Sequence, residues 1–242
     1  MKGFVFHGTG KSAWEEVPDP GIKDPTDAIV RVDAVTICGT DLHILKGDVP
    51  EVPSGTVLGH EAVGEIVETG SDVRTVRPGD RVLVSCITAC GRCRFCREAA
   101  YGQCQGGGGW ILGHLIDGTQ AEYVRVPYAD LSVHPLPGGL ASRDAVLFAD
   151  IFPTAYEVGV MNGAVRPGDT VAVVGPVPSD SPRSSPPSST HPSGSSPWTS
   201  PTPGSRPPDA SAPTPSPPSA TIRSNWSPTS LTAWAPTWPS RP

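Results

Sequence analysis

The sequence predicts a mainly β domain with a few helices, followed by the first strand of an α/β domain and then by a tail that forms no core. Three observations support this order. Short apolar runs cut by Gly, Pro and Asp fill the chain up to about residue 133, and the apolar spacing then becomes helical. Of the 30 prolines, 11 lie before Pro176 and 19 lie from Pro176 onward. A core-forming region is therefore joined to one that lacks the composition of a packed domain.

The β part contains four stretches in which apolar and polar residues alternate, as in half-buried strands. They are Ile29–Val35, Gly64–Val67, Arg81–Val84 and Ala121–Val126. Regularly spaced short strands with turn signals between them are typical of a barrel or a sandwich.

The segments Val76–Val82 and Val165–Val171 share the pattern V-R-P-G-D-x-V. Each is predicted to be a turn that leads into a strand, in which Pro sets φ and Gly takes a positive φ. A true internal repeat is the less favoured reading, because the flanking residues differ.

The residues from Ser142 to Asn162 have helical spacing, and Thr170–Gly175 is a continuous apolar strand that ends in Gly. A strand of this kind opens a parallel nucleotide-binding sheet.

Charge and composition exclude several classes of partner. The net charge is −6 and the chain has no basic run, so we expect no binding to nucleic acid or to an anionic membrane. No apolar stretch is long enough to span a bilayer, and the N-terminus does not have the pattern of a signal peptide. We therefore expect a cytoplasmic protein. All six cysteines lie between Cys38 and Cys104, which in a reducing compartment favours metal binding over disulfides.

Four of these cysteines form a dense cluster with the spacing C-x2-C-x2-C-x7-C. They are Cys90, Cys93, Cys96 and Cys104. Four thiolates complete a tetrahedral shell with no open position, so the cluster is predicted to hold a structural zinc. An iron–sulfur cluster is the rival, because its ligand spacings overlap. The remaining Cys86 is expected to be a small buried residue.

A second constellation begins at Gly59, which opens the pattern G-H-E-x2-G-x5-G-x2-V ending at Val73. Cys38-Gly-Thr-Asp-Leu-His43 lies upstream, and Asp150 follows a helical apolar run downstream. Here residues 1–175 resemble the zinc-dependent medium-chain alcohol dehydrogenases. The resemblance implies a GroES-like zinc-binding catalytic domain over residues 1–150 and the start of a Rossmann coenzyme domain over residues 151–175. It also implies two zincs per subunit, NAD(P) as coenzyme, and a homo-oligomer in the intact family.

Carried over position by position, the resemblance makes Cys38 and His60 ligands of a catalytic zinc, with Asp150 as the third ligand where many members of the family have Cys. Glu61 would be an alternate ligand beside the metal, and Asp41 the carboxylate that orients His60. A zinc with an open position lowers the pKa of an alcohol, so that hydride can pass to a nicotinamide.

The same resemblance makes Thr40 and His43 a hydroxyl–imidazole relay that carries the proton to solvent. Each residue also has an ordinary structural reading: Thr40 as a helix N-cap and His43 as a surface residue of that helix. No pattern gives His7, His114 or His134 a partner, so all three are expected to be structural.

The resemblance ends after Gly175, where the family requires G-x-G-x-x-G to bind the coenzyme's pyrophosphate. The chain continues Pro-Val-Pro-Ser-Asp instead, and Pro176 and Pro178 remove backbone donors from that loop. The phosphate loop is therefore lost, and we assign no cofactor-binding residue.

A frameshift explains the change. If one base is deleted after the codon of Gly175, back-translation with GC-rich codons restores VAVVGAGPVGLAAVLTAQFYSP, which contains GAGPVG. The restored second strand ends in Asp, which favours NAD over NADP. Residues 176–242 are thus interpreted as an out-of-frame, disordered tail. The alternative is a genuine Pro/Ser-rich linker or PxxP ligand.

Two functions follow as expectations. The first is a zinc-dependent oxidoreductase that acts on a small alcohol or carbonyl substrate, inactive here without its coenzyme domain. The second is a non-enzymatic zinc-binding module with a proline-rich interaction tail.

Overall fold

The structure is a computed structural model that describes residues 1–171. Its main body is a five-stranded antiparallel sheet of order β6-β3-β4-β5-β7. The strands are β3 (Ala28–Val35), β4 (Ala62–Thr69), β5 (Arg81–Val84), β6 (Tyr123–Val126) and β7 (Val133–Pro135). A separate hairpin pairs β1 (Lys2–Phe6) with β2 (Ser12–Glu16). Bridges from Gly3 to Ala121 and from Val5 to Val57 join this hairpin to the rest of the domain.

The sheet is buried on both faces near its centre. One face carries the main apolar cluster, which includes Val30, Ile66 and Leu112. The opposite face carries a second cluster in which Ala34 and Val63 pack with Val146 of the helical segment. Because both faces are covered, β3 is mostly buried rather than half-buried, and its alternation in the sequence is only partial.

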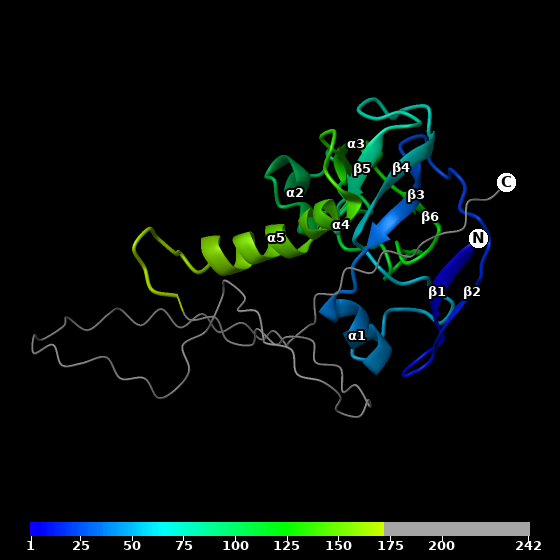
Figure 1. The fold of residues 1–242 in the computed structure, drawn as a ribbon, viewed down its shortest axis with the longest axis horizontal. Helices are drawn as coiled ribbons and strands as arrows, with labels where there is room; N and C mark the ends of the chain where they lie inside the picture. Colours follow the sequence, from blue (N-terminus) through cyan, green and yellow to red (C-terminus); the bar gives the residue numbers. More distant parts are fainter. Residues whose placement is uncertain (172–242) are drawn as a thin grey trace, which may run out of the picture.

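The helices are short. They are α1 (Gly39–Lys46), α2 (Arg94–Arg97), η1 (Tyr101–Gln103), α3 (Ala129–Ser132), α4 (Ser142–Ala145), η2 (Val146–Phe148), α5 (Ile151–Thr154) and η3 (Ala155–Met161). Of these, α4 packs against the inner strands β3 and β4. The helical segment predicted for Ser142–Asn162 is confirmed as the four successive pieces from α4 to η3. In Figure 1 this segment extends away from the sheet as an arm. No helix in residues 1–171 combines the length and apolar character that a membrane span requires.

The two V-R-P-G-D turns have the same geometry. Gly79 and Gly168 both have φ +93°. The amides of Arg77 and Arg166 donate to the Asp side chain three residues later, at 2.9 and 2.8 Å. The predicted positive φ is thus confirmed in both turns, and the first turn leads into β5.

All four predicted strands are present, although β6 begins two residues after Ala121. The strands β1, β2 and β7 were not predicted, because their residues do not stand out from neighbouring loops in apolar spacing. In the strand predicted for Thr170–Gly175, the first two residues are irregular and the others lie outside the described residues. The tail predicted for 176–242 also lies outside them.

Candidate functional site

Four predicted ligands from three distant parts of the chain meet at one place. One candidate ligand atom from each of Cys38, His60, Glu61 and Asp150 lies within 4.8 Å of all the others. Cys38 follows β3 and is the N-cap of α1, His60 and Glu61 precede β4, and Asp150 is the N-cap of α5. The sheet and the helical arm therefore assemble this site from residues that are up to 112 positions apart.

Asp41 links the start of α1 to His60. Its Oδ2 accepts hydrogen bonds from the amide of Cys38 and from Nε2 of Gln120, both at 2.9 Å. Its Oδ1 lies 4.0 Å from Nδ1 of His60. The carboxyl group is buried, and this burial raises its pKa. Asp41 thus stands beside the imidazole at the distance of an ion pair, longer than a direct hydrogen bond.

His60 is buried among acidic groups. Its Nε2 lies 3.4 Å from Oδ2 of Asp150 and 3.7 Å from Oε1 of Glu61. Burial alone would lower the pKa of His60, but the hydrogen bonds with Asp150 and Cys38 outweigh it and hold that pKa well above its ordinary value. The indole of Trp110 meets the imidazole edge-on, with ring centroids 6.2 Å apart.

Glu61 is the residue that most needs an explanation. Its side chain is 1% exposed, and neither carboxylate oxygen has a hydrogen-bond partner. Burial raises its pKa to about 7. Leaving a buried carboxylate unpaired is costly, and proteins commonly compensate such a group with a bound cation. The orphaned oxygens point to a cation at this cluster.

The donor set fits zinc. A thiolate, an imidazole and carboxylate oxygens are the ligands that Zn²⁺ takes in proteins. Cys38 Sγ lies 3.9 Å from Asp150 Oδ2, close enough for one ion to contact both atoms. The charges of a thiolate and a carboxylate also offset that of the ion.

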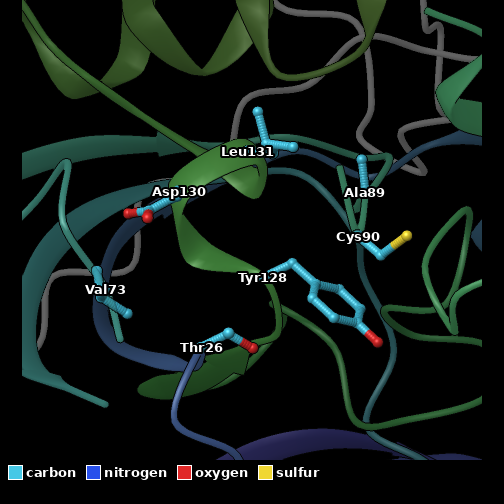
Figure 2. Close-up of a pocket in the computed structure, with 7 residues that line it drawn as sticks. All are labelled: Thr26, Val73, Ala89, Cys90, Tyr128, Asp130 and Leu131. Atoms are coloured by element: carbon cyan, nitrogen blue, oxygen red, sulfur yellow. The ribbon is translucent and has the colours of Figure 1, made fainter. Parts of the chain in front are cut away.

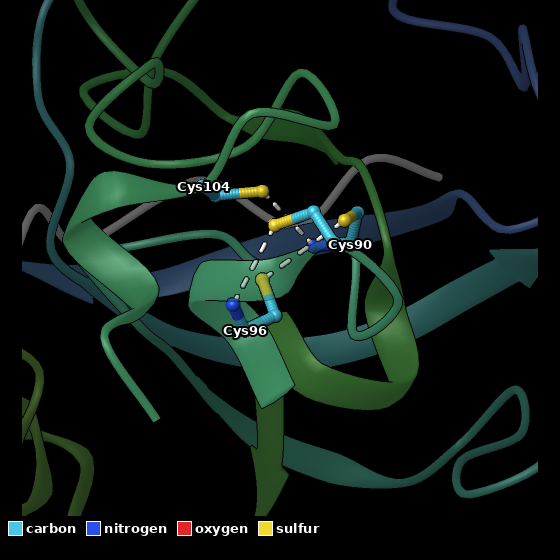
Figure 3. A group of neighbouring side chains, drawn as sticks. Cys90, Cys96 and Cys104 are labelled. Atoms are coloured by element: carbon cyan, nitrogen blue, oxygen red, sulfur yellow. Dashed lines mark hydrogen bonds between the residues drawn. The ribbon is translucent and has the colours of Figure 1, made fainter. Parts of the chain in front are cut away.

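The four-cysteine cluster forms a second candidate metal site. The sulfurs of Cys90, Cys93, Cys96 and Cys104 all lie within 4.8 Å of one another. Figure 3 shows the side chains of Cys90, Cys96 and Cys104 directed toward one another. The sulfurs of Cys90 and Cys96 are 3.9 Å apart. This agrees with the distance of about 3.8 Å between two sulfur ligands of a tetrahedral zinc with Zn–S bonds of about 2.3 Å.

Backbone amides support the thiolate form in this cluster. Cys96 N donates to Cys93 Sγ and Cys90 N donates to Cys104 Sγ, both at 3.5 Å. The bond from Cys96 N is the main reason that the pKa of Cys93 is lowered to about 6. The thiolate is the form that binds metal.

Comparison with known proteins identifies relatives of this chain. Residues 24–138 match the family model of the alcohol dehydrogenase GroES-like domain. The chain is 44% identical over 156 residues to zinc-type alcohol dehydrogenase B of Aspergillus flavus, covering 64% of this chain and 36% of that protein. It is 41% identical over 188 residues to an alcohol dehydrogenase of Cupriavidus necator, covering 72% of this chain and 50% of that protein.

The N-terminal part of this chain belongs to the zinc-dependent medium-chain alcohol dehydrogenase family. A solved structure of zinc-dependent alcohol dehydrogenase 2 from Streptococcus pneumonia superposes with a TM-score of 0.65 at 47% identity, over 69% of this chain and 47% of that one. The alcohol dehydrogenase from Thermus sp. ATN1 gives 0.64 at 39% identity, over 70% of this chain and 49% of that one. The chain therefore spans about half the length of these dehydrogenase structures.

Thr40 and His43, the predicted proton relay, both lie on α1, but their surroundings differ. Thr40 Oγ1 lies 3.4 Å from Cys38 Sγ, at the first metal site. His43 is 42% exposed and its Nδ1 lies 2.7 Å from Oδ2 of Asp48. Within the described residues, no hydrogen bond joins His43 to Thr40 directly. The N-cap alternative for Thr40 is wrong, because Cys38 caps α1.

The four-cysteine site of this dehydrogenase domain is held against the sheet by Tyr128. Its hydroxyl donates to the carbonyl oxygen of Gly106, in the loop that follows Cys104. Figure 2 shows the ring of Tyr128 and the side chain of Cys90 lining the same pocket. Gly106 is in close contact with the site, because a Cβ there would lie 2.4 Å from Cys90 Sγ.

Sequence reasoning missed several residues around the first site. Trp110 lies edge-on to His60, and His114, which was expected to be structural, stacks on Trp110 with ring centroids 4.1 Å apart. Gln120 holds Asp41, and the hydroxyl of Thr154 donates to Asp150. None of these positions carries a motif, so only the fold reveals them.

Cys86 was expected to be a small buried residue, and it is mostly buried. Burial raises the pKa of its thiol, and the charge of Asp150 adds to that rise. Its amide donates to the carbonyl of Ala149 at 3.2 Å, which joins β5 to the residue before Asp150.

Proposed function

We propose that this chain carries the zinc-binding catalytic domain of an alcohol dehydrogenase, whose substrate is a small alcohol or the corresponding carbonyl compound. The observation that carries the proposal is the buried cluster of Cys38, His60, Glu61 and Asp150, with both oxygens of Glu61 unpaired. Relatives at 39–44% identity are named as alcohol or formaldehyde dehydrogenases, which supports this class of substrate.

In this proposal Cys38, His60 and Asp150 hold a zinc ion, and Glu61 serves as an alternate ligand. When bound, the zinc supplies a Lewis acid that lowers the pKa of an alcohol. Asp41 keeps the imidazole of His60 oriented through charge, and its own position is fixed by the amide of Cys38 and by Gln120.

Thr40 is proposed to accept the proton that the substrate loses. Its hydroxyl lies beside Cys38, whereas His43 is exposed and paired with Asp48. The relay between them must therefore run through another group, such as a water molecule or a coenzyme hydroxyl, before His43 passes the proton to solvent.

The four-cysteine site is proposed to hold a second, structural zinc, giving two per chain. Four sulfurs leave no position for a substrate, so its contribution is to the stability of the fold.

We further propose that residues 1–150 form the catalytic domain and residues 151–175 the start of a coenzyme domain, and that the chain does not turn over. The residues after Gly175 lack G-x-G-x-x-G, and the matching part of this chain covers only 47% and 49% of two solved dehydrogenase structures. Phe148, Phe152 and Tyr156 of the helical arm are 49–60% exposed, which fits an arm that normally packs on the missing half.

The test measures metal and activity on the full chain. We expect two zinc ions per chain, one of which is lost in Cys38→Ser and the other in Cys93→Ser. We also expect no NAD(P)-dependent oxidation of simple alcohols, because the sequence after Gly175 lacks the G-x-G-x-x-G pattern that binds the coenzyme's pyrophosphate. Turnover would contradict the proposed inactivity, and two zinc ions retained in either variant would contradict the ligand assignment.

The same measurements address the alternatives. Visible absorbance with bound iron would identify an iron–sulfur cluster at the four cysteines. A non-enzymatic zinc-binding module would be favoured by two results together. The folded chain would bind zinc only at the four cysteines, and the nucleotide sequence around Gly175 would be confirmed.

A further inference from the structure

We propose that Thr154 is a positioning residue, whose hydroxyl holds one oxygen of Asp150 so that the carboxylate offers only its other oxygen to the metal. The proposal rests on the proposed function, since it concerns the same site. It adds a residue that neither the family pattern nor the sequence motifs single out.

The two oxygens of Asp150 have different surroundings. Oδ1 accepts a hydrogen bond from the hydroxyl of Thr154. Oδ2 lies 3.4 Å from Nε2 of His60 and 3.9 Å from Sγ of Cys38. The carboxylate therefore directs one oxygen into the cluster and the other back onto its own helix.

The backbone holds Thr154 in place for this contact. Its amide donates to the carbonyl oxygen of Asp150 at 2.7 Å, which closes the first turn of α5. Asp150 is the N-cap of this helix, with φ −146° and ψ −56°, so its own backbone leaves the helical conformation. Residues four apart lie on one face of a helix, and this spacing brings the hydroxyl under the carboxylate.

Glu61 provides the contrast. Both of its oxygens are buried and neither accepts a hydrogen bond within the described residues; Oε1 lies 3.7 Å from Nε2 of His60. Asp150 is thus the fixed carboxylate of the site and Glu61 the free one.

The consequence concerns the number of metal–oxygen bonds. A carboxylate can bind a metal through one oxygen or through both. A hydrogen bond that occupies Oδ1 opposes binding through both oxygens and so protects the position that a substrate needs. Partners of ligands contribute in this way to the geometry and affinity of metal sites.

The experiment uses Co²⁺ in place of zinc in the full chain, because its visible spectrum reports the coordination number. The spectrum of the first site is isolated by subtracting that of the same protein with Cys38→Ser. Thr154→Val removes the hydroxyl at nearly constant volume, and Thr154→Ser restores it. Thr75→Val is the matched control, since Thr75 also donates to an aspartate, Asp130, at 2.8 Å in another part of the domain.

In Thr154→Val, Oδ1 of Asp150 is free to bind the metal as a second oxygen. We then expect the visible ligand-field bands of the first site to weaken roughly two-fold. The alternative expected result is that the Co²⁺ affinity of that site falls about 10-fold or more. Thr154→Ser and Thr75→Val should match the unmodified chain. If Thr154→Val does not fold by circular dichroism, Thr154→Ala replaces it.

An unchanged spectrum and affinity in Thr154→Val would overturn the proposal, as would a serine variant that behaves like the valine variant. Failure of the proposed function would look different. In that case the unmodified chain would show no Co²⁺ signal that Cys38→Ser removes.

Discussion

Replacing Gly106 with Ala should release zinc from the four-cysteine site. An added Cβ would lie 2.4 Å from Cys90 Sγ and 2.8 Å from Cys90 Cβ, whereas ordinary contacts begin at 3.4 Å. The sulfur of Cys90 must therefore move by about 1 Å. Zinc–ligand distances tolerate only about 0.2 Å, so a shift of this size is incompatible with a four-sulfur shell in its present place.

The magnitude has two parts. Overpacking costs about 1–3 kcal/mol in the metal-free protein, and 1 kcal/mol corresponds to a Tm change of about 2–4 °C in a domain of this size. The loss of zinc adds to this, because metal bound only by the folded state stabilises it by mass action. We expect Tm to fall by at least about 2 °C in the presence of chelator and by clearly more in the presence of zinc.

The assay is zinc per chain by atomic emission, together with thermal melts with and without chelator. Gly102→Ala is the matched control, because it lies in the same loop region and an added Cβ there meets nothing within 4 Å. A Gly106→Ala protein that keeps its full zinc complement and the Tm of the control would refute the steric reasoning.

Three further predictions concern the same domain. Tyr128→Phe removes the hydrogen bond to Gly106 and should speed zinc release to a chromogenic chelator about 10-fold; an unchanged rate would show that the hydroxyl is dispensable. Burial would raise the pKa of Asp130, but three hydrogen bonds from the chain before β5 outweigh it and hold that pKa below its usual value. Asp130→Asn should therefore lower stability by up to about 1 kcal/mol at pH 7, after screening by solvent. Because the pKa of Asp130 is lowered in the folded state, the stability difference between the Asn variant and the unmodified chain should disappear as the pH falls through that pKa. Thermal melts of both proteins at several pH values test the direction of this change. Gly64→Ala places a Cβ 2.1 Å from the carbonyl oxygen of Arg31 and should cost about 3 kcal/mol or more in denaturant unfolding; a smaller cost would mean that the two strands can separate locally.

The glycines of the Gly59 motif show why a sequence pattern could indicate the site in advance. Gly59 has φ +92° and lies against the backbone of Gln120, while Gly64 and Gly70 lie against the carbonyl oxygens of Arg31 and Pro25. At all three positions a side chain would collide with backbone. The spacing of the motif therefore records close approaches between strands and loops, and it places His60 at a fixed point beside β4.

The four-cysteine site could be predicted from spacing alone, because its ligands lie within fifteen residues and need only local chain folding. The first site could be predicted only through the family resemblance, because its ligands come from three distant segments. The polar support of each site was beyond prediction. Gln120, Thr154 and Tyr128 each contribute a single hydrogen bond. A single hydrogen bond does not produce a repeating residue pattern, so it cannot be recognised in the sequence.

The difference in assembly also gives the two proposed metal ions different roles. The four cysteines lie in one short loop region, so a metal bound there would stabilise that loop and, through it, the fold. The first site instead joins the end of β3, the start of β4 and the start of the helical arm, and it places the carboxylates of Glu61 and Asp150 in one buried space. A cation there would relieve the repulsion between them and would also tie the arm to the sheet. In the proposed function, the chemistry of the site and the position of the arm would then depend on the same ion, with Asp150 as the link between them.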